Sequence, residues 1–274
     1  ENSRLLGDTT STGITAAIAS TGTLTSPTAT GANVDFVYVR NNVIKGGYFG
    51  IALSGNSLTD FDNNVVIENN QLLKQYYYGM RLYLMANVLV KGNTVKGLRN
   101  TFNYGVYTFY TRNMDVESNN IMAGTYGLYL YYPNYNVTVA PAANNKIVNN
   151  MATGATYPSY FYSPRYLNIY HNTFKGGTYG YYSAAATTAG QDLRELNIKN
   201  NIFAGSTNAF YQVAIYPAAN NVTLDYNAYS STGTNLAYYG ANQANLAAWQ
   251  TSAATLNTNS VAGNVLFVAS DDLH

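Results

Sequence analysis

The chain has 274 residues, only 10% of them are charged, and its formal net charge is +1. This near-neutral balance argues against partners that are recognised by charge, such as nucleic acid or an acidic membrane surface. The absence of cysteine excludes disulfide bonds and thiolate metal sites, and no apolar run approaches the roughly 18 residues of a membrane-spanning helix.

Residues 1–33 are rich in Thr, Ala, Gly and Ser, and they contain the pairs Gly13-Ile14 and Ala17-Ile18. We predict that this segment forms one or more irregular first units of the repeat that follows, although its composition also suits a flexible lead-in. Because the sequence has no initiator Met and no signal peptide, we expect a mature or excised piece.

Residues 34–230 repeat a short frame that reads apolar, any, apolar, any, any, Asn, any, apolar. Spacings between successive Asn residues run from 22 to 31 residues, which is typical of stacked supersecondary units, here called rungs. The residue three positions before each Asn is always aliphatic. The aligned asparagines are Asn42, Asn70, Asn93, Asn119, Asn150, Asn172, Asn201 and Asn227.

The frame has strand periodicity up to the Asn, because apolar and polar residues alternate. Asn tolerates the left-handed backbone region, so we expect each frame Asn to bend the chain sharply between two strands. Stacked rungs would place the side-chain amides above one another at about 4.8 Å, where they form an Asn ladder.

A second motif, aromatic-Gly-apolar, follows most of these asparagines. It predicts a further strand in each rung, and therefore an all-β parallel β-helix of about eight or more rungs. The clear copies are Tyr48-Phe49-Gly50-Ile51, Tyr78-Gly79-Met80, Tyr104-Gly105-Val106, Tyr126-Gly127-Leu128 and Tyr179-Gly180-Tyr181, with degenerate copies at Pro158-Ser159-Tyr160 and Asn208-Ala209-Phe210.

Residues 231–274 are expected to complete the same domain. Leu246 and Trp249 stand at helical spacing after Asn242 or Asn245, either of which suits a helix N-cap, so we predict a short amphipathic helix. Residues 265–268 then form a terminal strand. Neither end of the solenoid has an obvious charged cap, and we therefore expect self-association, end to end or side by side.

The repeated frame, with Gly-Ile/Leu-Tyr-Leu between its copies, resembles the right-handed parallel β-helix repeat of the pectin-lyase-like family, from about Val34 to Tyr229. The C-terminal part is similar to the end of β-helix modules in very large bacterial surface proteins exported by the type IX route. That resemblance implies an extracellular or cell-surface protein. It is carried by Asp225-Tyr226-Asn227-Ala228-Tyr229, Leu246-Ala247-Ala248-Trp249-Gln250, Asn259-Ser260-Val261, Leu266-Phe267-Val268 and Asp271-Asp272-Leu273-His274.

One candidate site is the outward position two residues after each motif glycine. Strand parity places it opposite the core residue, so consecutive rungs display an aromatic side chain on one outer face. Such a row suits a glycan lying along the axis or a neighbouring protein surface, and it also suits simple cross-strand stacking. The candidate ligand-binding residues are Tyr107, Tyr129, Phe161, Tyr182 and Tyr211.

A second candidate lies two residues before the frame Asn, where Glu68, Lys91 and Glu117 follow one another. In an enzyme they would serve as acid and base on an acidic sugar, as the likeness to polysaccharide lyases implies. Their alternating signs are what a cross-rung ion-pair ladder predicts, and we favour that ladder. The sequence lacks the Asn-Thr-Asp, Asp-Asp and Gly-His-Gly set of polygalacturonase-like proteins.

Two further features carry weaker signals. His171 replaces an Asn in one turn, and a lone His in a polar turn is more often structural than catalytic. Asp60 and Asp62 lie in a polar loop and make a weak candidate Ca²⁺ site, but a solvated turn is favoured over a metal and no cofactor is expected.

These patterns favour a non-enzymatic extracellular structural or adhesive module with a Tyr-rich outer face for glycan or protein contact. One alternative is a carbohydrate-active enzyme of pectin-lyase-like fold, either a polysaccharide lyase or a glycoside hydrolase. Another is a self-assembling filament subunit. A fold does not determine a function, so the sequence leaves these alternatives open.

Overall fold

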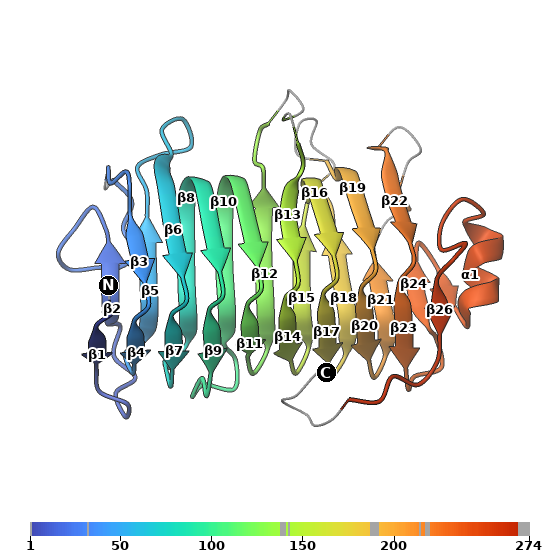
Figure 1. Cartoon of the computed structure of the whole chain (residues 1–274), viewed down its shortest axis with the longest axis horizontal. Coiled ribbons are helices and arrows are strands. Elements are labelled where there is room, and N and C mark those ends of the chain that lie inside the picture. The colour runs from blue at the N-terminus through green and yellow to red at the C-terminus, as the bar shows by residue number, and fades with distance from the viewer. Residues whose placement is uncertain are drawn as a thin grey trace.

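The computed structural model describes residues 2–31, 33–137, 141, 143–186, 192–213, 215–216 and 220–267. These residues form a parallel β-solenoid whose rungs follow one another along the long axis, with one short helix at the C-terminal end (Figure 1). The predicted all-β parallel β-helix is therefore confirmed. The strands belong to one sheet of ten strands and one sheet of sixteen strands.

The ten-stranded sheet contains the strand that follows the Asn of each rung, and all of its pairings are parallel. Its strands are, in order, β1 (Arg4–Leu6), β4 (Val43–Lys45), β7 (Gln71–Leu73), β9 (Thr94–Lys96), β11 (Asn120–Met122), β14 (Met151–Gly154), β17 (Thr173–Gly176), β20 (Ile202–Gly205), β23 (Ala228–Ser231) and β26 (Val261–Ala262).

The sixteen-stranded sheet has two arms. The first arm contains the aromatic-Gly-apolar strands, namely β2 (Ala16–Ser20), β5 (Phe49–Ser54), β8 (Tyr78–Lys91), β10 (Tyr104–Glu117), β12 (Tyr126–Pro133), β15 (Tyr157–Tyr162), β18 (Tyr179–Ala184), β21 (Asn208–Gln212) and β24 (Ala237–Tyr239), with β25 (Asn242–Gln243) antiparallel to β24. The second arm contains the frame strands β3 (Tyr38–Arg40), β6 (Asp62–Glu68), β13 (Asn145–Val148), β16 (Arg165–Tyr170), β19 (Arg194–Lys199) and β22 (Val222–Asp225). The long strands β8 and β10 run through both arms.

The core is a column of apolar side chains enclosed by the two sheets. All eight aliphatic residues that precede the frame Asn by three positions are buried, as the strand periodicity predicts. They are Val39, Ile67, Val90, Val116, Ile147, Ile169, Ile198 and Leu224.

The eight frame asparagines form the predicted ladder. In each step the backbone N–H and the side-chain Nδ2 of one Asn donate to the Oδ1 of the next, at 2.9–3.0 Å. The ladder is closed at both ends, because the Ser3 N–H donates to Asn42 and the Asn227 N–H donates to Ser260 Oγ, each at 3.0 Å. These bonds satisfy buried amides that would otherwise be costly.

The prediction that the frame Asn itself takes the left-handed conformation is wrong. The residue before it does, with φ between 54° and 64° at Asn41, Asn69, Gly92, Ser118, Asn149, His171, Asn200 and Tyr226. The frame Asn must direct its backbone N–H along the axis to the next ladder oxygen, so the preceding residue makes the turn.

At the C-terminal end, helix α1 (Leu246–Ser252) is capped by Asn245, whose side chain accepts from the Ala248 N–H at 2.9 Å. Trp249 is fully buried, with its ring centroid 5.2 Å from both Phe210 and Tyr229. The short helix is therefore confirmed. The expected strand over 265–268 is wrong where the structure describes it: β26 lies at Val261–Ala262, and residues 264–267 form no strand.

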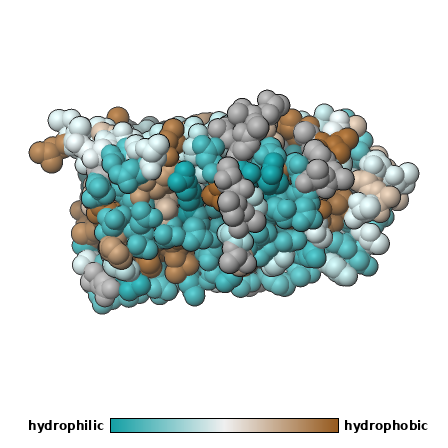
Figure 2. Space-filling model, turned by 90° about the horizontal axis from the view of Figure 1, so that it is seen from above, coloured by the Kyte–Doolittle hydropathy of each residue, from teal (hydrophilic) through white to brown (hydrophobic). Residues whose placement is uncertain are grey.

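Residues 2–31 contribute β1 and β2, which pair with β4 and β5. Residues 268–274, with the terminal part of the resemblance, lie outside the described residues. Among described helices, none is long and apolar enough to cross a membrane. On the face shown in Figure 2, the described side chains are mostly hydrophilic and the hydrophobic ones are scattered.

Candidate binding face on the first arm

The middle row of the first arm is a line of outward tyrosines in exact β-register. Successive ring centroids are 4.5–5.1 Å apart and the rings are nearly parallel, at 5–16°. The strand register that aligns them is parallel throughout. The members of the middle row are Tyr107, Tyr129, Tyr160, Tyr182, Tyr211 and Tyr238.

Two more rows flank the middle row on the same face. The leading row is Phe49, Tyr78, Tyr104, Tyr126, Tyr157 and Tyr179, with centroids 4.6–5.4 Å apart. The trailing row is Tyr83, Phe109, Tyr131 and Tyr162, at 4.4–5.3 Å. The leading and middle rows meet edge to face, as at Tyr104–Tyr107 and Tyr126–Tyr129, both 5.1 Å. We call the three rows together the tyrosine face.

The stacking determines what the tyrosine face presents. Each inner ring of the middle row, from Tyr129 to Tyr211, has its two faces against the rings of neighbouring rungs, which leaves its rim and hydroxyl group to face outward. The rim of an aromatic ring carries the positive end of its quadrupole. The cross-strand stacking, which was one of the interpretations of the aromatic row in the sequence, is therefore present. The stacked rings carry a line of hydroxyl groups, one per rung.

Phe161 is not part of this face, and its predicted outward placement is wrong. Its side chain is fully buried, and Tyr160 takes the outward position beside Tyr129. Pro158, not Ser159, occupies the position of the motif glycine, because Tyr157 pairs with Tyr126 and Ser159 with Leu128. A shift of one residue moves every side chain to the opposite face.

Sequence reasoning also missed Tyr238, which lies beyond the regular repeat and extends the middle row by one rung. The signal that would have located Tyr160 is the spacing between an aromatic residue at the start of the strand and another three positions later. This spacing is shared by Tyr126 and Tyr129 and by Tyr157 and Tyr160.

Burial among the neighbouring rings keeps the phenols protonated. It raises the pKa of Tyr157 to about 12, and it also raises the pKa of Tyr107, Tyr182 and Tyr211. The hydroxyl groups of these four tyrosines are neutral at physiological pH, where each one can donate and accept hydrogen bonds.

The charged residues Glu68, Lys91 and Glu117 are neighbours in the second arm, as their sequence positions predict. Lys91 pairs with Glu117 at 3.6 Å, and Arg40 pairs with Glu68 at 3.5 Å. These are cross-rung ion pairs that favour the observed register. An acid–base role for the three residues stays a prediction.

His171 is exposed and occupies the left-handed turn position, with φ 56°. Asp60 accepts from Asn56 Nδ2 at 2.6 Å, whereas the buried Asp62 accepts from the Val34 N–H at 3.1 Å. Burial raises the pKa of Asp62. Within the described part of the chain, no third acidic or histidine side chain joins these two aspartates in a group that would hold a metal ion.

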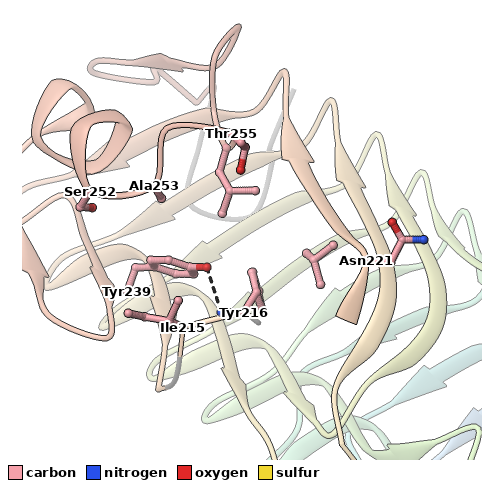
Figure 3. Close-up of a pocket in the computed structure, with 9 residues that line it drawn as sticks. Ile215, Tyr216, Asn221, Tyr239, Ser252, Ala253 and Thr255 are labelled. Carbon is pink, nitrogen blue, oxygen red and sulfur yellow. Dashed lines mark hydrogen bonds between the residues drawn. The ribbon is translucent and has the colours of Figure 1, made fainter. Parts of the chain in front are cut away.

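A cavity of about 320 Å³ lies at the C-terminal end (Figure 3), and none of its lining residues belongs to the tyrosine face. The Tyr216 N–H donates to the Tyr239 hydroxyl at 2.9 Å beside it. Its lining includes Ile215, Asn221 and Thr255, and no charged side chain is among the lining residues.

A family model described as "Periplasmic copper-binding protein (NosD)" matches residues 14–188, which is more than half of the chain. The chain belongs to the NosD family. The match covers most of the regular rungs and the greater part of the tyrosine face. No curated protein and no solved structure matches the chain.

The NosD family description mentions copper binding, so we asked whether this chain has side chains that could ligate copper. Protein copper sites use His, Cys or Met ligands. The chain has no Cys. His171 stands exposed in a turn, and Met80, Met85 and Met114 are buried in the apolar core. The other two methionines, Met122 and Met151, are partly exposed on the paired strands β11 and β14. His274 lies outside the described residues. Among the described residues, no three His, Cys, Asp or Glu side chains come together in a group that could hold a metal ion.

Proposed function

We propose that this NosD-family chain is a non-enzymatic, extracytoplasmic binding module that holds an extended glycan along its tyrosine face. The observation that carries the proposal is the unbroken middle row, in which Tyr107, Tyr129, Tyr160, Tyr182, Tyr211 and Tyr238 stand one per rung. A linear ligand parallel to the axis meets the same group at every rung.

The chemistry of the accessible groups supports a glycan in particular. The faces of the inner rings are covered by other rings, so the contacts that they offer are neutral hydroxyl groups and positively polarised ring rims. A glycan offers hydroxyl and ether oxygens, which accept from the phenols and lie favourably against the rims. Because the tyrosines are already stacked, little side-chain freedom is lost on binding, which favours affinity.

Localisation outside the cytoplasm is part of the proposal. The family description names periplasmic proteins, and the resemblance of the C-terminal part implies display on the cell surface. Protease treatment of intact cells distinguishes the two compartments, because only a surface protein is cleaved while the outer membrane is sealed.

Binding to a glycan array tests the function. We expect the unmodified chain to bind, and the triple variant Tyr107→Ala/Tyr129→Ala/Tyr182→Ala to lose binding while it remains folded by circular dichroism. Tyr226→Ala is the matched control, because Tyr226 is an exposed tyrosine outside the three rows. Absence of any glycan bound by the unmodified chain would overturn the proposal, and release of new sugar ends from a bound glycan would overturn its non-enzymatic part.

A further inference from the structure

On β8, Arg81 occupies the outward position that comes directly before Tyr107, the first tyrosine of the middle row. In the strand register it stands between Ala52 on β5 and Tyr107 on β10. Ala52 is buried and small, so Arg81 ends the line of hydroxyl-bearing rings on the N-terminal side. The middle row thus has a cation at its N-terminal end.

Two contacts orient the Arg81 guanidinium. Its Nη1 donates to the buried Ser54 Oγ at 2.8 Å, and its central carbon lies 5.1 Å from the centre of the Tyr83 ring. A guanidinium has five N–H donors, so the bond to Ser54 uses one of them. The contact with Tyr83 is a cation–π interaction that further restricts the plane of the group.

Arg81 differs from several other arginines of the solenoid because it has no carboxylate partner within the described residues. Arg40 pairs with Glu68, and Arg165 and Arg194 both pair with Asp192. Burial lowers the pKa of Arg81, yet arginine stays protonated at any physiological pH. A partly desolvated cation without a counter-charge is costly, and an anionic ligand would offset that cost.

The surroundings of Arg81 favour an anion as well. Its neighbours Tyr78, Tyr83 and Tyr107 are tyrosines, whose hydroxyl groups can donate hydrogen bonds to an anionic oxygen. Hydrogen bonds from a guanidinium to a carboxylate or sulfate are charge-assisted and roughly twice as strong as those between neutral groups.

We propose that Arg81 forms an oxyanion subsite at the N-terminal end of the tyrosine face, and that the bound glycan carries carboxylate or sulfate substituents. This inference rests on the proposed function, because it names the class of glycan that the same face takes. Arg81 determines specificity in this arrangement, while the tyrosine rows supply the contacts common to all glycans.

The test measures affinity by calorimetry for three soluble polymers of similar length: a neutral glucan, a polyuronate and a sulfated glucan. We expect the unmodified chain to bind an anionic polymer more tightly than the neutral one. Arg81→Met lowers the affinity for the anionic polymer about tenfold or more and leaves that for the neutral glucan unchanged. Arg81→Lys keeps the positive charge but lacks the planar guanidinium. Its affinity for the anionic polymer should therefore lie between those of the unmodified chain and Arg81→Met.

The control is Lys96→Gln, which removes one positive charge from the exposed end of β9 on the other sheet. If Arg81 acts by local contact and not through the net charge of the chain, Lys96→Gln should leave the affinities for the neutral glucan, the polyuronate and the sulfated glucan unchanged. Preference between polyuronate and sulfated glucan identifies the anion. Equal affinity for all three polymers, unaffected by Arg81→Met but lost in the triple tyrosine variant, overturns the subsite and keeps the binding function. Absence of binding to every polymer overturns the binding function itself.

Discussion

Asn150 illustrates how a single side chain joins three rungs. Its Oδ1 accepts from both the N–H and the Nδ2 of Asn119, at 3.0 and 2.9 Å. Its own Nδ2 donates to the Val116 carbonyl at 2.9 Å and to Asn172 Oδ1 at 3.0 Å. Because the side chain is fully buried, none of these partners has water as a substitute.

We expect Asn150→Ala to destabilise the fold by about 2–4 kcal/mol, because the substitution leaves buried donors and a buried acceptor unpaired. The measurement is the urea-unfolding midpoint. Asn120→Ala is the matched control, since Asn120 is the partly exposed first residue of β11 in the preceding rung and takes no part in the ladder. Equal midpoints for the two variants would show that the ladder contributes no specific stability.

The neighbours Tyr160 and Phe161 separate the core from the face. Phe161 is fully buried, with its ring 5.3 Å from that of Tyr181, whereas Tyr160 is half-buried in the middle row. Strand alternation gives the two adjacent side chains opposite environments.

We expect Phe161→Ala to cost about 3–5 kcal/mol of stability, since it opens a cavity in the core. Tyr160→Ala should cost less than about 2 kcal/mol, because it removes two cross-rung stacking contacts, yet it should weaken glycan binding. Unfolding and binding are measured on the same two proteins. A larger loss of stability for Tyr160→Ala would contradict the assigned register.

Part of this arrangement at the residue scale could be predicted from the sequence, and part could not. The core aliphatics and ladder asparagines were predictable because every rung repeats the same environment at the same frame position. The left-handed turn residue was not, because Asn, Gly, Ser, His and Tyr all occupy it. Its conformation follows from the direction of ladder hydrogen bonds, which residue type alone does not encode.

At the scale of the element, the aromatic-Gly-apolar motif explains how the first arm packs against its neighbours. A Cβ added at Gly105 would overlap the Ile121 side chain and would lie 2.7 Å from the Gly127 carbonyl oxygen of the next rung. The glycine is therefore required by close approach between rungs. Where Pro158 takes this position, the rung no longer shows the motif, and for that reason the register of β15 was not predictable from the motif alone.

We expect Gly105→Ala to destabilise the fold by about 1–3 kcal/mol or more, because the added methyl group forces neighbouring backbone apart. Gly263→Ala is the control, since a Cβ there meets nothing within 4 Å. Thermal unfolding monitored by circular dichroism compares the two. An unchanged unfolding temperature for Gly105→Ala would mean that the rungs separate at little cost.

At the scale of the whole molecule, the tyrosine face links stability to alkaline pH. Unfolded tyrosines ionise near pH 10, whereas burial raises the pKa of Tyr157 to about 12 in the folded chain. Above pH 10 the unfolded state loses protons that the folded state retains, so ionisation favours unfolding. The stabilisation by Tyr157 is fully present below pH 10 and is lost as the pH rises towards 12.

We therefore expect the urea midpoint to stay constant from pH 8 to about pH 9.5 and then to fall steeply up to pH 12. Absorbance of phenolate in the folded protein should appear at higher pH than in the urea-unfolded protein. A midpoint that does not change across this range would show that the tyrosines have ordinary pKa values in the folded chain.

The two ends of the solenoid differ, which bears on self-association. Helix α1 and Trp249 cover the core at the C-terminal end (Figure 1). At the other end β1, β2 and β3 are the outermost described strands of their sheets. Association of copies end to end or side by side, which the sequence led us to expect, stays a prediction, and light scattering over a range of concentrations tests it.

The middle row has one further consequence for a bound polymer. Because successive rungs offer nearly the same group at nearly the same spacing, a chain shifted by one rung along the axis finds almost equivalent contacts. A ligand longer than the row can therefore bind in several equivalent registers, and this multiplicity adds entropy to the bound state. It also allows the polymer to slide along the protein from one register to the next without dissociating. Arg81 lies at one end of the row, and its contact with an anionic group of the polymer would favour one of these registers.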